Sequence, residues 1–379
     1  MVASGNTRGI DSSASVALDL VRFLLAFSVA TAHWSQRYFQ DGRPDITALS
    51  LAAVGGFFVL SGFTIRFITA GSAFRLDDYL IRRLARLWSV ALPALLATAV
   101  LDSLAAHINP GFYLANWHQE FPLLRLVANA LFVSQPWGAD IEPLSNSPFW
   151  SVAYEAWFYI LYGLVLARKP LWALAMALAA GPNIWFLMPL WGSGMVAYEL
   201  LARARTRAQL TSLLCAALVL CALIAGALGT RWDDVHAGYE RLLGAYFGFF
   251  HVDPARAGRS FGLTAGAVVF APSMLALLAA IKLVSPRVPE ATVKIARWLG
   301  EFTFPLYLLH VPLFVLCASI GFYDRHSSIE TAGTFLAVCL LISLAVPLTN
   351  RFKGALQRVL PKLAMGVYRR ELPRLVTPP

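Results

Sequence analysis

Long apolar stretches, separated by short segments rich in arginine, dominate the pattern of this chain. A helix needs about twenty residues to cross a bilayer, and a window of that length finds nine predicted spans. They cover residues 16–36, 47–69, 87–106, 148–167, 184–202, 210–229, 262–281, 297–320 and 331–349. A tenth stretch, residues 171–182, is too short for a straight crossing. The pattern predicts an all-α polytopic membrane protein with about ten transmembrane helices.

The distribution of Lys and Arg over the connecting segments orients this bundle. With ten crossings and the N-terminus inside, 22 of these residues fall in inner segments, eight fall in outer segments and Arg22 falls within a span. Because cytoplasmic loops carry an excess of Lys and Arg, we expect both termini to be cytoplasmic. Residues 1–15 are expected to form a disordered leader and residues 16–350 the membrane domain. Residues 351–379 are expected to form a basic cytoplasmic tail lying against anionic lipid.

The composition excludes several other classes of protein. The chain of 379 residues is 58% hydrophobic and 14% charged, with a mean hydropathy of +0.63, which is far too apolar for a soluble domain. Its net charge of +10 is explained by the basic inner loops, so no nucleic-acid partner is expected. The four cysteines lie in apolar stretches without CxxC spacing, and neither a disulfide framework nor a metal site is expected.

The first predicted span contains charged and titratable residues that a bilayer-spanning helix normally excludes. Arg22 and His33 are eleven residues apart, so they project from the same helix face about 16 Å apart along the axis. Asp19 lies three residues before Arg22 and can pair with it, which lowers the cost of burying the guanidinium. Ionisable residues inside a membrane are functional by default, although an ion pair can also merely hold two helices together.

An arginine cluster precedes the third span. Arg82 and Arg86 are four residues apart, share a helix face and offer two planar donors to phosphate oxygens, whereas Arg83 is expected to point elsewhere. Alone, such a cluster is more often a topology signal or a contact with lipid headgroups than a ligand site. The cluster therefore indicates a site for an anionic ligand only in combination with other residues.

A second buried acid, Glu155, lies one helical turn after Ser151 in the outer half of its span. It could orient His33 or a hydroxyl-bearing substrate, or it could simply be held by neighbouring helices. His310 is also predicted to lie within the membrane, where a histidine beside a proline can cap carbonyls that the proline leaves free. The supporting residues expected around the site are Asp19, Ser61, Ser151, Tyr307 and His310.

The chain resembles the acyltransferase 3 family of membrane enzymes from about residue 16 to residue 350. The resemblance rests on five segments that occur in the order typical of the family. They are Leu18-Asp-Leu-Val-Arg22 with His33, Phe57-Phe-Val-Leu-Ser-Gly-Phe63, Arg82-Arg83-x-x-Arg86, Trp150-Ser-x-x-x-Glu155-x-x-Phe-Tyr159, and Leu299-Gly-Glu-Phe-Thr-Phe-Pro-Leu-Tyr-Leu-Leu-His310.

The resemblance implies a transmembrane O-acyltransferase that modifies a hydroxyl of an extracytoplasmic carbohydrate or glycosylated acceptor, such as a polysaccharide. It implies cytosolic acyl-coenzyme A, most commonly acetyl-CoA, as co-substrate and no tightly bound cofactor. His33 is the expected central catalytic residue, Glu155 is expected to be essential, and Arg22, Arg82, Arg83 and Arg86 lie toward the donor. The expected location is a bacterial cytoplasmic (inner) membrane, as a multi-pass protein in contact with lipid.

The expected chemistry is general-base catalysis, because a neutral imidazole at position 33 can take a proton from the acceptor hydroxyl. A mechanism in which His33 itself carries the acyl group stays open. The competing class is a secondary transporter for an anionic metabolite, which would use Arg22 and His33 as a substrate and proton site. That class predicts inverted sequence halves and paired broken helices, and the sequence has neither.

Two long outer loops carry aromatic residues among polar ones. Residues 107–147 and 230–261 contain Trp117, His118, Trp137, Trp232, Tyr239 and Tyr246. These rings could stack against a sugar, or they could anchor the protein at the membrane interface, where aromatic residues are enriched.

Overall fold

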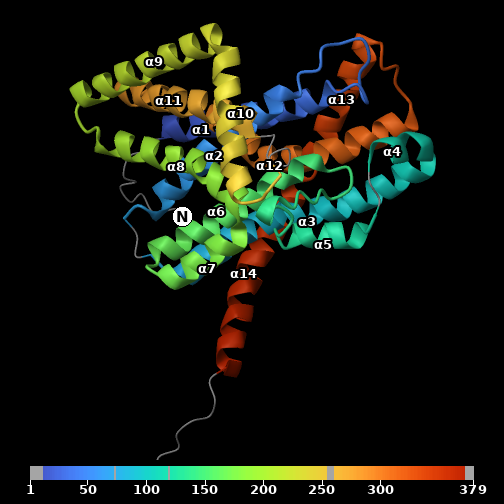
Figure 1. Cartoon of the computed structure of the whole chain (residues 1–379), viewed down its shortest axis with the longest axis horizontal. Coiled ribbons are helices and arrows are strands. Elements are labelled where there is room, and N and C mark those ends of the chain that lie inside the picture. The colour runs from blue at the N-terminus through green and yellow to red at the C-terminus, as the bar shows by residue number, and fades with distance from the viewer. Residues whose placement is uncertain (1–11, 72–73, 118–119, 254–259, 372–379) are drawn as a thin grey trace, which may run out of the picture.

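The protein is a bundle of α-helices, seen in a computed structural model that describes residues 12–71, 74–117, 120–253 and 260–371 (Figure 1). The helices within these ranges are α1 (Ser12–Trp34), α2 (Ala48–Thr69), α3 (Leu76–Ile108), α4 (Pro110–Asn116), α5 (Pro122–Ala130), α6 (Trp150–Leu166), α7 (Pro170–Ala180), α8 (Pro182–Arg203), α9 (Arg207–Thr230), α10 (Trp232–Phe249), α11 (Ser260–Val284), α12 (Glu290–Ile320), α13 (Ser328–Ser343) and α14 (Val346–Glu371). Two short 3-10 turns, η1 (Pro136–Gly138) and η2 (Ser147–Phe149), precede α6. The described residues contain no strands, which confirms an all-α polytopic membrane protein.

Nine candidate membrane-spanning segments in the described residues coincide with the nine predicted spans. Several helices extend beyond the apolar stretch that predicted them, and α3 continues for 33 residues because its arginine-rich first turns are also helical. Of the expected leader, residues 1–11 lie outside the described residues, and α1 begins at Ser12. The expected tail continues from α13 as the helix α14 up to Glu371.

The short stretch at residues 171–182 forms the eleven-residue helix α7, which returns the chain toward the beginning of α6. The Trp137 Nε1 group donates a hydrogen bond to the Leu178 carbonyl over 2.9 Å, and the Asn183 Nδ2 group donates to the Tyr154 hydroxyl over 3.0 Å. Tyr154 lies in the second turn of α6, so α8 starts near that end of the bundle. The helix α7 therefore carries the chain back along α6, but with eleven residues it is shorter than the nine candidate membrane-spanning segments of the described residues.

Glycines let α2 approach two other helices closely at the centre of the bundle. A Cβ atom added to Gly62 would lie 1.9 Å from the Trp191 carbonyl oxygen in α8, and one added to Gly55 would lie 2.2 Å from the Leu263 carbonyl oxygen in α11. Small residues at such contacts allow tight backbone packing between membrane helices. Gly55 and Gly62 therefore fix α2 in place, and with it the polar side chains of that helix.

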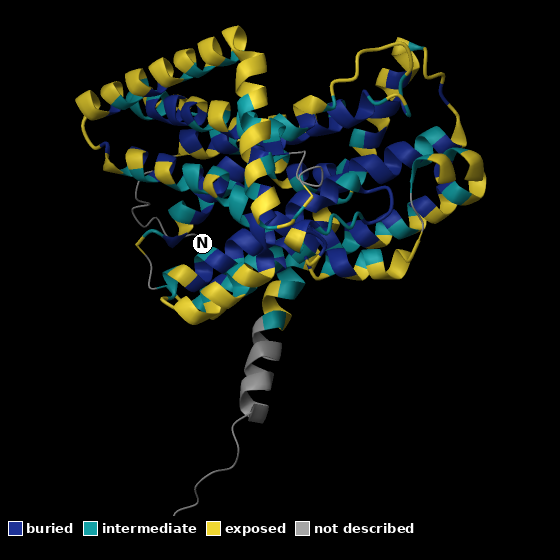
Figure 2. Ribbon diagram, viewed as in Figure 1, coloured by how far each residue is buried: buried dark blue, intermediate teal, exposed yellow. Residues whose placement is uncertain are grey.

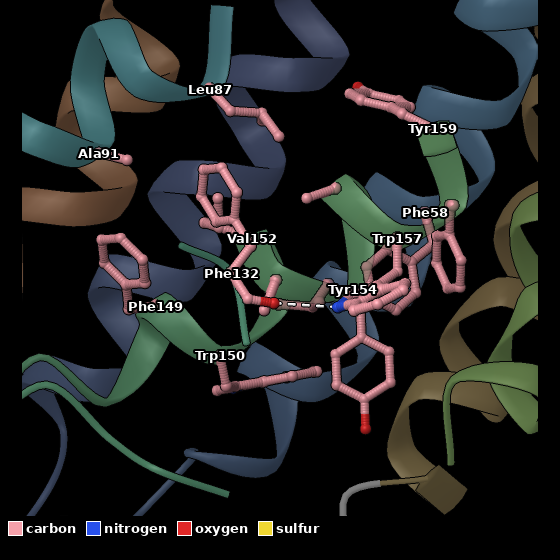
Figure 3. Close-up of a cluster of buried hydrophobic side chains, with 14 of the residues drawn as sticks. Phe58, Leu87, Ala91, Phe132, Phe149, Trp150, Val152, Tyr154, Trp157 and Tyr159 are labelled. Atoms are coloured by element: carbon pink, nitrogen blue, oxygen red, sulfur yellow. Dashed lines mark hydrogen bonds between the residues drawn. The ribbon is translucent and has the colours of Figure 1, made fainter. Parts of the chain in front are cut away.

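The largest buried cluster joins α2, α3, α6 and α8 (Figure 3). Aromatic side chains of α6 fill it, and the Trp157 indole donates a hydrogen bond to the Phe132 carbonyl over 2.9 Å. At the edge of the molecule, α9 exposes most of its surface (Figure 2), including Leu218, Val219 and Leu223. Because α9 is strongly apolar, this surface fits contact with lipid.

The direction of α1 defines two ends of the bundle. We call the side on which α1 begins, with Asp19 and Arg22, the arginine end. The side on which α1 ends, with His33 and Trp34, is the histidine end. Because α12 packs beside α1, its residue His310 lies near the histidine end as well.

Candidate active site

Arg22 is tied to two helices at the arginine end. Its Nη1 atom donates to Asp19 Oδ1 over 2.9 Å, and its Nη2 atom donates to Thr64 Oγ1 on α2 over 2.8 Å. The predicted ion pair with Asp19 is thus present. Thr64, which sequence reasoning missed, holds the guanidinium in one orientation toward the space between the helices. The sequence signal that could have revealed Thr64 is its position one helical turn after Ser61, on the same face of the predicted span.

The arginine cluster of α3 faces the bundle through Arg83 and Arg86, and this corrects the expectation that Arg82 and Arg86 would act together. Arg82 is exposed, whereas Arg83 and Arg86 are half-buried. Tyr79 and Val90 are eleven residues apart, so they mark one buried face of α3. Arg83, one helical turn after Tyr79, lies on the same face. Arg82 is one residue earlier and therefore points about 100° away from it.

A cavity of about 100 Å³ lies between α1, α2, α3, α6 and α12. Arg22 and Arg86 line it at the arginine end. Ser61 and Glu155 line its middle, and Tyr307 closes it toward the histidine end. The remaining lining is mostly apolar, and comprises Val54, Phe57, Phe58, Leu60, Thr64, Ile65, Leu87, Ser151, Val152, Tyr159, Gly300, Thr303 and Phe304. A mostly apolar cavity with cations at one end fits an elongated ligand with an anionic head.

Glu155 accepts hydrogen bonds from side chains of α2 and α6 within this cavity. Ser61 Oγ donates to Glu155 Oε1 over 2.6 Å, the Tyr159 hydroxyl donates to the same oxygen, and Trp191 Nε1 donates to Ser61 Oγ over 3.2 Å. Glu155 makes no hydrogen bond to His33 in the described part of the chain, which corrects the expectation that it would orient this ring; Ser61 and Tyr159 bond its carboxylate. The carboxylate instead lies near the cations, where Arg83 interacts with it electrostatically.

Tyr307 separates the cavity from the histidine end. Its hydroxyl is 2.7 Å from Ser151 Oγ and donates to the Pro148 carbonyl over 3.1 Å, while its ring packs edge-on against Phe57. Neither His33 nor His310 is among the described residues that line the cavity. Tyr307 precedes His310 by one helical turn, so the cavity ends about 5 Å along the axis before that histidine.

His33 and His310 form a buried pair between α1 and α12. The His33 Nδ1 atom is 2.9 Å from the His310 Nε2 atom, and the two rings are stacked with centroids 5.1 Å apart. His33 is 9% exposed and His310 is fully buried. His310 does not cap the Leu308 carbonyl that Pro312 leaves free, as we expected of it, because Asn146 bonds that carbonyl; His310 contacts the expected catalytic residue instead.

The carbonyl groups around the pair determine where its protons lie. His310 Nδ1 is 2.8 Å from the Leu306 carbonyl, which can only accept, so His310 Nδ1 carries a proton. In a neutral ring, His310 Nε2 is then an acceptor, and His33 Nδ1 must donate to it. The lone pair of His33 therefore resides on Nε2, where it is available as a base.

The loop before α6 supports the histidine pair through residues that sequence reasoning missed. Asn146 Nδ2 donates to the Leu308 carbonyl over 2.8 Å, and this carbonyl lacks its usual helical partner because residue 312 is proline. Asp102, buried in α3, accepts from the Tyr113 hydroxyl and from Ser145 over 2.7 Å each. The sequence signal that could have revealed Asp102 is the presence of a carboxylate near the end of the predicted span 87–106.

Two aromatic residues of the second long loop, Tyr239 and Tyr246, pack against the bundle. The Tyr239 hydroxyl is 3.0 Å from Thr264 Oγ1, and the Tyr246 hydroxyl donates to the Pro182 carbonyl over 3.0 Å. Both rings also contact Phe186. His118 lies outside the described residues. These contacts favour the interpretation of Tyr239 and Tyr246 as structural anchors over sugar stacking.

These features define an integral membrane protein that encloses a cationic cavity and, one turn beyond it, a histidine pair with a free basic nitrogen. A family model described as an acyltransferase domain matches residues 15–349. The chain belongs to the acyltransferase 3 family and is a multi-pass membrane acyltransferase. No match was found among curated proteins or among solved structures.

Proposed function

We propose that the protein transfers an acyl group, acetyl in the simplest case, from cytosolic acyl-coenzyme A to a hydroxyl of an extracytoplasmic carbohydrate or glycosylated acceptor. The observation that carries this proposal is the placement of the cations and the histidine pair on either side of one cavity. Arg22 and Arg86 suit the phosphates of a coenzyme A thioester, because guanidinium groups bind phosphate oxygens in a bidentate manner. The mostly apolar lining of the cavity suits the uncharged arm of the donor, whose amides can bond the polar side chains of Ser61 and Ser151.

In the proposed reaction, His33 Nε2 takes the proton from the acceptor hydroxyl while the hydroxyl oxygen attacks the thioester carbonyl. The tetrahedral intermediate then collapses, the carbon–sulfur bond breaks, and the His33 imidazolium returns its proton to the departing thiolate. His310 is a positioning residue, because its Nε2 accepts from His33 Nδ1 and keeps the lone pair on the reactive nitrogen. Tyr307 has to swing aside for the thioester to reach His33.

A covalent variant would place the acyl group on His33 Nε2 before the acceptor attacks. Mass spectrometry of the intact protein, taken after donor is added without acceptor, separates the two routes. An added acyl mass that is lost on substitution of His33 supports the covalent route. An unmodified protein that turns over once acceptor is supplied supports direct transfer.

The acceptor is tested by comparing the glycans and exported metabolites of cells with and without the gene. We expect at least one hydroxyl compound to lose a single acyl mass when the gene is absent and to regain it when the gene is restored. Mass spectrometry of envelope glycans and culture medium measures this difference. Identical acylation in both strains, with the protein present in the membrane of the first, would contradict the proposed function.

A further inference from the structure

The first turns of α14 lie against the arginine end of the bundle. Figure 1 shows α14 projecting away from the bundle, and where it joins the bundle it packs mainly against α3. The Asn350 Nδ2 group donates to Glu301 Oε2 on α12 over 2.9 Å, which fixes the beginning of α14 beside that helix. Lys353, one turn further along, is half-buried on the part of the chain where α14 packs against α3, the helix that carries Arg83 and Arg86.

Three cations from two helices therefore gather beside the cavity. Arg83 Nε is buried, and none of the described residues offers it a hydrogen-bond acceptor. Glu301 is the acid that interacts with Lys353, and Glu155 interacts with Arg83. Gathering like charges where water is partly excluded costs free energy, and a multiply charged anion relieves this cost. An orphaned guanidinium nitrogen indicates that the anion would be a hydrogen-bond acceptor such as a phosphate.

We propose that Lys353, together with Arg83 and Arg86, forms a binding site for the phosphate groups of the nucleotide part of acyl-coenzyme A. This site deepens the proposed function and rests on it for the identity of the donor. Lys353 lies beyond residue 349, where the family match ends, so the C-terminal helix contributes a donor contact from outside the matched domain. Phosphate groups of anionic lipids have the same chemistry, and the test has to separate the two sources.

The direct test uses adenosine 3′,5′-bisphosphate as a probe and the full-length protein in nanodiscs of zwitterionic lipid. We expect Lys353→Gln to raise the Kd of the probe about tenfold, the scale of one lost charged contact, and Lys353→Arg to restore it. Arg358→Gln is the matched control. Arg358 lies on the same helix, is exposed and donates its Nε hydrogen only to the Gly354 carbonyl of its own helix among the described contacts. Its substitution should leave the Kd unchanged.

A kinetic arm separates this site from the rest of the donor. Lys353→Gln should raise KM for acyl-coenzyme A and leave KM for acyl-pantetheine, which has no nucleotide phosphates, at its wild-type value. Equal effects on both thioesters would overturn the site. An unchanged Kd for the probe in Lys353→Gln would also overturn the site. If this variant still turns over acyl-coenzyme A, the proposed function would stand.

The lipid composition distinguishes the two sources of phosphate. Adding anionic lipid to the nanodiscs should weaken probe binding by no more than about twofold, the effect of general surface charge. If anionic lipid abolishes probe binding to the wild type but not to Lys353→Gln, the residue binds headgroups and the proposal is wrong. Probe binding that depends on Lys353 in a protein that consumes no thioester would uphold the site and overturn the proposed function.

Discussion

His33→Ala should abolish nearly all acyl transfer while the protein still folds and reaches the membrane. The substitution removes the only ring nitrogen that the hydrogen bonds of the pair leave as a free base, His33 Nε2. General-base catalysis of this kind contributes about 10²- to 10⁴-fold, so we expect at least that loss of turnover. The measurement is the amount of acylated product in cells that carry the variant, normalised to the amount of protein in the membrane.

The matched control for this substitution is His107→Ala. His107 lies in the last turn of α3 and is exposed, so its loss should leave acylation at the wild-type level. The binding of adenosine 3′,5′-bisphosphate to His33→Ala should also be unchanged, because His33 is about 16 Å along α1 from Arg22. Wild-type turnover in His33→Ala would refute the catalytic role.

His310→Leu should produce the second largest effect and should act on kcat rather than on KM. Leucine offers no acceptor to His33 Nδ1, so the proton of His33 is free to move to Nε2 and the base is lost in that tautomer. We expect kcat to fall at least about tenfold, within the range that base catalysis supplies. The KM for the thioester should stay at its wild-type value, because the donor cations lie beyond Tyr307.

A conservative substitution distinguishes positioning from packing at this residue. In His310→Gln the side-chain oxygen can occupy the place of Nε2 and accept from His33, so we expect a partial recovery of kcat relative to His310→Leu. If both variants lose activity equally, or if both lose folded protein, His310 serves only to pack α12 against α1. Steady-state kinetics and thermal unfolding of the purified variants measure the two effects.

Features local to one helix could be predicted from the sequence. The nine long spans follow from hydropathy, because a helix in lipid needs an apolar surface over a fixed length. The pairing of Asp19 with Arg22 follows from helical spacing alone, and the structure contains it. The assignment of Arg82 to the inner face failed, because residues three and four apart share a face equally well. Only the packing of α3 decides that Arg83 points inward.

Contacts between helices far apart in the sequence could not be predicted in the same way. The partner of His33 is 277 residues away, and hydropathy carries no information about which helices are neighbours. Glu155 was correctly placed within a span, but the geometry of one helix could not show that Ser61 and Tyr159 would bond it. Lys353 escaped notice because a basic tail is ordinarily interpreted as a lipid contact.

The central claim is that one imidazole joins a donor bound at the arginine end to a hydroxyl acceptor on the opposite side of the membrane. Sealed proteoliposomes test it most directly, with acyl-labelled coenzyme A thioester on one side and a glycan extract from gene-deleted cells on the other. The account predicts labelled ester on the enclosed glycans, free coenzyme A on the donor side, and neither product with His33→Ala. Uptake of the intact thioester or another anion without ester formation would contradict it and would indicate a transporter.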